Sequence, residues 1–124
     1  MNQTTDRNKQ RAREVIEKIV NGGDVDLADE YYREDYIQHN PDVGQGREAL
    51  KKVIRAMHSL VEPMHVEIKL INAEDDMVWL LLEWSGGSLP EGIPRIQQTA
   101  EIFRMEDGMM AEHWDVLQMT KRGS

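Results

Sequence analysis

The stretch Ala111-Glu112-His113-Trp114-Asp115-Val116 places two ionisable side chains and a large aromatic one in a segment that otherwise has the composition of a β-strand. Alternate residues of an extended chain share a face, so His113 and Asp115 point one way while Glu112 and Trp114 point the other. A histidine and a carboxylate on one face of a sheet are either solvated or functional. The rest of the chain decides between these two interpretations, according to whether it covers that face.

The composition indicates one acidic domain without thiol chemistry. The chain has 124 residues, a net charge of −8 and no cysteine, so we expect a single domain over 1–124 that folds without disulfides or a thiolate metal site. The acidic excess argues against nucleic acid as a partner. With no apolar core of a signal peptide and no apolar run of membrane-spanning length, we predict a cytoplasmic protein without a membrane partner. Residues 1–6 and 120–124 are expected to be flexible tails.

The first half of the sequence has the periodicity of helices. From Asp6 to Val20, apolar residues recur at three- and four-residue intervals, which predicts a helix with one apolar face. A short helix is expected through Leu27 to Tyr31. An extended piece, Asp35 to Pro41, then delivers His39 at the mouth of a loop. Leu50 to Leu60 carries the apolar stripe of a third helix.

The second half has the alternation and turn signals of an antiparallel meander. The expected strands are 64–70, 77–84, 95–105 and 109–119. The nearly continuous apolar run 77–84 predicts a strand covered on both faces, and the glycine- and proline-rich segment 86–94 predicts a loop that could act as a lid. Helices followed by a meander are typical of the α+β class, with the helices gathered on one side of the sheet.

Together the two halves predict a cone-shaped cavity. A strongly twisted four-stranded sheet curls, and amphipathic helices laid across its concave side leave a cavity open at one end. His113 and Asp115 fit best inside it. Pairing across the Asp107-Gly108 hairpin signal would bring Glu101 and Thr99 near them. A shift of one residue in the strand register would instead turn these side chains to the opposite face of the sheet.

The order of elements and three motifs resemble a known family. The likeness covers about Arg7 to Met119 and is to SnoaL-like proteins of the NTF2-like superfamily. Its motifs are Tyr36-Ile37-Gln38-His39-Asn40-Pro41, Gly46-Arg47-Glu48-Ala49-Leu50, and Glu101-Ile102-Phe103-Arg104-Met105-Glu106-Asp107-Gly108 running into Glu112-His113-Trp114-Asp115-Val116. The resemblance implies an NTF2-like cone, in which N-terminal helices pack on the concave face of a strongly curved, mostly antiparallel sheet that encloses a pocket. It also implies a homodimer through the outer sheet face.

The resemblance further implies a class of chemistry. Founding members are polyketide cyclases that close a ring by intramolecular aldol condensation without a metal or organic cofactor, using a pocket aspartate whose matching position is Asp115. The superfamily also contains isomerases, dehydratases, epoxide hydrolases and binding proteins. The expected function is therefore cofactor-free acid/base chemistry, as aldol cyclisation, isomerisation or dehydration, on a carbonyl-containing, largely apolar substrate. A non-catalytic small-ligand-binding protein of the same fold is the alternative.

The candidate catalytic residues are Asp115, His39 and His113. An enolate reaction needs a base to take a proton next to a carbonyl and a donor to hold the developing oxyanion. Asp115 is the expected base, and the two histidines are the expected proton partners or oxyanion donors. The alternatives are that Asp115 only orients His113 or Arg104, that His113 is a satisfied core histidine, and that His39 caps a turn.

Four further residues are candidates for substrate contact, namely Asn40, Trp84, Thr99 and Glu101. Trp84 could line either the cavity or the core. Trp114, opposite Asp115 by parity, is expected on the outer face as part of the homodimer interface. Two histidines with Glu101 or Asp115 could mimic an iron site. No helix carries a His-x-x-x-His pair, however, and the resemblance implies no metal, so none is expected.

Overall fold

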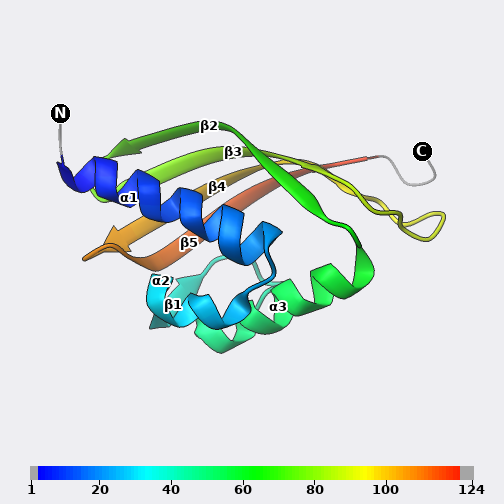
Figure 1. The fold of residues 1–124 in the computed structure, drawn as a ribbon, viewed down its shortest axis with the longest axis horizontal. Coiled ribbons are helices and arrows are strands. Elements are labelled where there is room, and N and C mark those ends of the chain that lie inside the picture. Colours follow the sequence, from blue (N-terminus) through cyan, green and yellow to red (C-terminus); the bar gives the residue numbers. More distant parts are fainter. Residues whose placement is uncertain (1–2, 121–124) are drawn as a thin grey trace.

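The computed structural model describes residues 3–120, in which helices pack on one side of a curved, five-stranded sheet (Figure 1). The strand order is β1-β5-β4-β3-β2, with β1 parallel to β5 and every other pair antiparallel. The strands are β1 (Tyr32–Gln38), β2 (His65–Glu74), β3 (Met77–Ser85), β4 (Ile96–Glu106) and β5 (Met109–Met119). The predicted α+β class is confirmed, and the expected four-stranded sheet gains β1 as a fifth strand.

The helices follow the predicted order. They are α1 (Gln3–Glu14), which continues into the π-helical η1 (Val15–Asn21), then η2 (Val25–Leu27), α2 (Ala28–Tyr31) and α3 (Gly46–Leu60). No helix of the described chain is long and apolar enough to cross a membrane.

Parts of both expected tails are ordered. The helix already begins at Gln3, within the segment expected to be a flexible tail. Thr120, expected in the other tail, exchanges two hydrogen bonds with the backbone of Arg95. The remaining positions of the two expected tails, 1–2 and 121–124, lie outside the described residues.

The core lies between the first helix and the inner face of the sheet. The apolar stripe that predicted this helix is buried, with Val15 and Ile19 fully inaccessible. It packs with inward-facing residues of the sheet such as Val78 and Leu80. Burial of side chains of this size stabilises a fold by roughly 1.5–3 kcal/mol each. In Figure 1, α1 lies along β2 and β3 while α3 lies beside β1.

Side-chain bonds to the backbone fix the first helical segment to both ends of the sheet. Asn21 donates to the carbonyl of Val66 and accepts from its N–H, both at 2.7 Å. At the other end, Arg11 donates through Nε to the carbonyl of Gly108 at 2.5 Å and through Nη2 to that of Glu30. Gly108 has a φ of 79°, as its tight hairpin requires. These contacts hold the first helical segment against the sheet.

Two strand predictions need correction. β2 continues through an irregularity after Ile68 as far as Glu74, past the expected end at residue 70, so the turn is confined to Asp75-Asp76. β3 is covered on one face only, because the helices pack on a single side of the sheet. Trp79 on its outer face is 53% exposed.

Candidate active site

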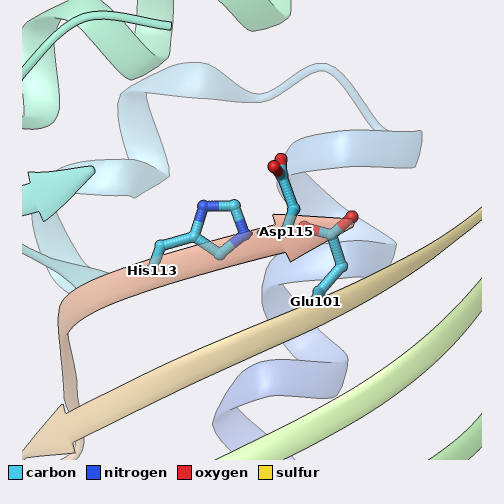
Figure 2. Close-up of side chains that lie close together, drawn as sticks. All are labelled: Glu101, His113 and Asp115. Atoms are coloured by element: carbon cyan, nitrogen blue, oxygen red, sulfur yellow. Dashed lines mark hydrogen bonds and ion pairs between the residues drawn. The ribbon is translucent and has the colours of Figure 1, made fainter. Parts of the chain in front are cut away.

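Two carboxylates and one histidine converge on the inner face of β4 and β5. The antiparallel register pairs Glu101 with Asp115 and Phe103 with His113, as expected from the hairpin. Figure 2 shows Glu101, His113 and Asp115 on the same side of these two adjacent strands. Glu101 and His113 are buried, Asp115 is half-buried, and one ligand atom of each lies within 4.8 Å of the others. The face is therefore covered, which answers the question raised by the sequence.

A short hydrogen bond joins His113 to Glu101. Nε2 of the imidazole lies 2.6 Å from Oε1 of the carboxyl group, and the ring stacks on Phe103 with centroids 4.6 Å apart. A contact of this length between a ring nitrogen and a carboxyl oxygen contains a proton, because two facing lone pairs would repel each other. His113 and Glu101 therefore share one proton.

The other ring nitrogen of His113 is held by Gln38, a buried residue at the end of β1. Oε1 of Gln38 accepts from the backbone N–H of Asn40 at 3.0 Å and lies 3.1 Å from Nδ1 of the imidazole. A backbone N–H can only donate, so the atom that faces both groups is the amide oxygen, an acceptor. The Tyr36 hydroxyl lies 3.3 Å from the same Nδ1 and can also accept. A proton on Nδ1 satisfies both contacts, and the nitrogen available for proton transfer is then Nε2.

Two buried tyrosines lie beside this histidine. Their rings, Tyr32 and Tyr36, meet edge to face with centroids 4.9 Å apart. Burial raises the pKa of both hydroxyls far above its ordinary value, and the charge of nearby Glu101 acts in the same direction. The Tyr36 hydroxyl, which accepts from Nε2 of Gln38 at 2.6 Å, is thus a neutral hydrogen-bonding group and not a base.

Asn40 holds the second carboxylate. Its Nδ2 lies 3.1 and 3.2 Å from the two oxygens of Asp115, and its Oδ1 accepts from the backbone N–H of Asp42 at 2.9 Å. The latter bond fixes the orientation of the amide, so hydrogens face the carboxylate. Asp115 is thereby positioned by a neutral donor, separately from the protonated pair formed by Glu101 and His113.

These polar groups line a cavity of about 250 Å³ whose remaining walls are largely apolar. The sheet contributes Leu82, Phe103 and Leu117, and the helices contribute mainly aliphatic side chains such as Ile16 and Ile54. Polar atoms converging in an apolar hollow are typical of small-molecule sites.

Trp84 and Thr99 line the same cavity and bind each other. The indole Nε1 of Trp84 donates to Oγ1 of Thr99 at 2.9 Å. The sequence left open whether Trp84 lines the cavity or belongs to the core. In the structure it lines the cavity and also packs against the core. Its indole plane is fixed by the threonine.

The structure places His39 outside the cavity, which corrects its expected position. β1 pairs in parallel with β5 so that Gln38 lies opposite His113, and His39, the next residue, points to the outer face. There it stacks on Trp114 with centroids 4.7 Å apart and bonds through Nε2 to Glu112 at 2.6 Å. His39 therefore contacts Glu112 and Trp114 and does not line the cavity.

The outer cluster of His39, Glu112, Trp114 and Arg104 is an ion-pair network. Arg104 donates to the carboxylate of Glu112 at 2.8 Å. The hydrogen bond from Arg104 is the main reason that the pKa of Glu112 lies below its ordinary value, and the contact with His39 adds to the effect. Trp114 is on the outer face, as parity predicted, but is half-covered by His39.

Glu101, His113 and Asp115 are also the residues that could hold a metal ion. Within residues 3–120 they form the one group of three candidate ligands, a histidine and two carboxylates, not the two-histidine set considered from sequence. Histidine and carboxylates suit several divalent transition metals. A cation bound to all three would have to replace the proton between His113 and Glu101.

The sequence pointed to Asp115, His113, Glu101, Thr99, Asn40 and Trp84, and the structure brings all six to one cavity. Tyr36 and Gln38 were missed as site residues. The sequence contained a signal for them, because alternate residues of an extended segment share a face. If Tyr36 is buried, Gln38 must be buried with it, and Ile37 and His39 must point outward.

Comparisons with known proteins agree with this architecture. TsrD from Streptomyces laurentii is 25% identical with a TM-score of 0.78, over 95% of this chain and 91% of that one. A proposed polyketide cyclase from Bacillus cereus ATCC 10987 is 21% identical with a TM-score of 0.79, over 90% and 74%. An LEH-like epoxide hydrolase from M. tuberculosis is 18% identical with a TM-score of 0.72, over 92% and 84%. These last two likenesses concern the fold alone.

A search of functionally curated proteins finds no significant match. The family model of the SnoaL-like domain, however, matches residues 12–113. This range contains β1 to β4 and the first part of β5, as far as His113. The chain belongs to the SnoaL-like family.

Proposed function

We propose that this protein is an enzyme that performs cofactor-free proton transfer on a carbonyl-containing, largely apolar small molecule. The reaction class is aldol cyclisation, isomerisation or dehydration. One observation carries the proposal: a carboxylate positioned by a neutral amide, Asp115, and a proton shared by His113 and Glu101 face the same apolar cavity. Base and acid are thus present together and are held by different partners.

The two groups divide the work of enolate chemistry. Asp115 takes a proton from the carbon next to the substrate carbonyl, while the proton shared by His113 and Glu101 is donated toward the carbonyl oxygen as negative charge develops there. The apolar walls exclude water and strengthen both interactions. Asn40 keeps the Asp115 carboxylate oriented through the cycle.

The test is substitution of the base without loss of fold. Asp115→Asn should retain the unfolding temperature within a few degrees and reduce turnover of an identified ketone substrate by at least about 100-fold, the lower range for general acid–base catalysis. Glu112→Gln is the matched control, because it removes a carboxylate from the same strand on the opposite face and should leave turnover intact. Undiminished turnover in Asp115→Asn would refute the assignment of the base.

Independence from cofactors is tested separately. Turnover should persist at the wild-type rate after exhaustive dialysis against a chelator, and metal analysis of the dialysed protein should show substoichiometric metal. If activity disappears with the chelator and returns with a divalent cation, the group formed by Glu101, His113 and Asp115 is a metal site and this part of the proposal is wrong.

A non-catalytic ligand-binding protein is the second candidate, and one observation favours it. The polar side chains that β4 and β5 contribute to the cavity already have partners within the chain: Asp115 has Asn40, Glu101 has His113, and Thr99 has Trp84. A pocket of satisfied polar groups can bind an apolar ligand without reacting with it. Tight binding of cyclic ketones without conversion, with affinity retained in Asp115→Asn, would favour this function.

We also propose that the protein forms a homodimer through the outer sheet face. Two rows of this face are apolar across neighbouring strands. Leu70, Leu81, Ala100 and Val116 form one row, and Trp79, Ile102 and Trp114 form the other. Leu70, Trp79 and Val116 are 61%, 53% and 66% exposed, and an exposed apolar patch of this kind favours a self-complementary contact.

The dimer is tested by sedimentation velocity. Wild-type protein should sediment as a dimer, and Trp79→Glu or Val116→Glu should shift it to the monomer. Leu60→Glu is the matched control, because Leu60 is also more than half exposed but lies at the end of α3, away from this face. A monomeric wild-type protein at micromolar concentration would contradict the proposal.

A further inference from the structure

A second hollow adjoins the site cavity at the open end of the cone. It lies beneath the loop 86–95 between β3 and β4, which extends past the sheet near the end of α3 (Figure 1). We call it the loop-covered hollow. It has a volume of about 170 Å³, and the residues found in its walls but not in those of the site cavity include Leu60, Val61, Leu89, Ile93 and Met119.

The wall between the loop-covered hollow and the site cavity is made of side chains. Four residues line both spaces: Met57, Met64, Trp84 and Ile96. Methionine is unbranched and changes rotamer readily, so two of the four can move aside. Trp84 is held by its bond to Thr99, and therefore one face of the passage has a fixed position.

The roof of the hollow is attached to the rest of the chain at both ends. Gly87 approaches Val61 so closely that an added Cβ would lie 2.7 Å from its Cγ1. At the other end, Arg95 donates to the carbonyl of Gly86 and its backbone pairs with Thr120. The loop therefore stays over the hollow while its middle presents Leu89 and Ile93.

The walls leave apolar surface uncovered. Leu60 and Ile93 both line the hollow, yet they are 58% and 48% exposed. Neither space alone reaches the roughly 300 Å³ at which ordinary small-molecule pockets begin, whereas the two together exceed it. A ligand that occupied both would cover this surface and fill a pocket of usual size.

We propose that the loop-covered hollow is a subsite for an unbranched hydrocarbon tail of the substrate. This proposal rests on the proposed function, in which the carbonyl group is bound near Asp115 and His113. The substrate class is then an amphipathic ketone whose reacting head lies in the site cavity and whose alkyl tail passes Trp84 and ends against Ile93. Chain length, more than ring size, becomes the basis of selectivity.

The test is a homologous series of methyl ketones from 2-butanone to 2-dodecanone, with dissociation constants measured by calorimetry. Each CH₂ buried in the hollow should tighten binding about four-fold. Ile93→Asp should abolish this gain for the longer ketones while leaving the affinity of the shortest unchanged. Ile37→Asp is the control, because it adds the same charge at a similarly exposed position of β1 that lines neither space, and it should keep the wild-type gain.

A parallel series of 1-alkanols separates this proposal from the proposed function. If alkanols gain affinity with length as steeply as ketones and Ile93→Asp removes the gain, the subsite is supported even where no ketone is converted. If neither series gains affinity beyond six carbons, or if Ile93→Asp keeps the wild-type gain, the subsite is overturned. Methyl signals of Met57 and Met64 should shift with the long ligands and not with the short ones.

Discussion

Replacement of Gln38 by leucine should change the tautomer of His113. In the wild-type protein the amide oxygen of Gln38 is the acceptor for Nδ1–H of the imidazole, which leaves Nε2 to share a proton with Glu101. Leucine has a similar volume but no acceptor. The Tyr36 hydroxyl, 3.3 Å from Nδ1, can then donate to an unprotonated Nδ1. The Nδ1 proton passes to solvent while Nε2 keeps the proton that it shares with Glu101, so the site holds one proton fewer.

The same substitution should destabilise the fold by an amount that the contacts predict. It removes the acceptor of the half-buried Asn40 N–H and the donor to the buried Tyr36 hydroxyl. Each buried polar group left unsatisfied costs about 1–3 kcal/mol, so a loss of about 3 kcal/mol is expected. For a chain of this length that corresponds to a decrease of roughly 10 °C in Tm.

The assay is long-range ¹⁵N–¹H NMR of the imidazole, which needs no substrate. The wild-type spectrum should show Nδ1 protonated, Gln38→Leu should show the proton on Nε2, and Gln38→Glu, which keeps an oxygen facing Nδ1, should retain the wild-type pattern. A wild-type His113 protonated on Nε2 alone would refute the reasoning. An unchanged tautomer in Gln38→Leu, with the Tm lowered as expected, would show that Gln38 is structural only.

Three further predictions concern stability. The pKa of Glu112 is held below its ordinary 4.5, chiefly by Arg104. The ionised Glu112 therefore stabilises the fold fully above about pH 4.5, and this stabilisation is lost as pH falls through the lowered pKa. The difference in unfolding free energy between wild type and Glu112→Gln should shrink on acidification, and a pH-independent difference would contradict this. Leu82→Ala, at a site 1% exposed, should cost about 2–5 kcal/mol in urea unfolding, and a loss below 1 kcal/mol would indicate that the cavity collapses. Arg11→Ala should increase hydrogen exchange at the 107–109 hairpin, because its bond to Gly108 is lost, while exchange in α3 stays unchanged.

The part of the site that could be predicted depends on local geometry. Asp107-Gly108 fixes a tight hairpin, and an alternation of two residues per face then determines which side chains of β4 and β5 share a surface. Glu101, Thr99 and Asp115 follow from that register without knowledge of any other element. The same parity argument placed Trp114 correctly on the outer face.

The errors arose where non-local pairing decides the outcome. The segment 35–41 was recognisable as extended. Nothing in its own sequence says that it belongs to a strand paired in parallel with β5, and the position of His39 depends on that pairing. The apolar run of β3 predicted two covered faces, whereas only the inner one is covered. Apolar composition cannot distinguish a core-facing residue from one such as Trp79 that remains exposed on an unpartnered face.

The strand whose pairing the sequence did not predict is also the one that positions the polar side chains on the inner face of β5. Without β1, His113 and Glu101 would still meet, but the histidine would have no acceptor for Nδ1–H and Asp115 no amide donor. Gln38 and Asn40, two residues apart at the end of β1, supply both. A half-buried carboxylate beside a buried histidine is stable only when each has its own partner. The parallel pairing of β1 with β5 therefore both closes the sheet at this edge and determines which group of the site holds a proton and which can accept one.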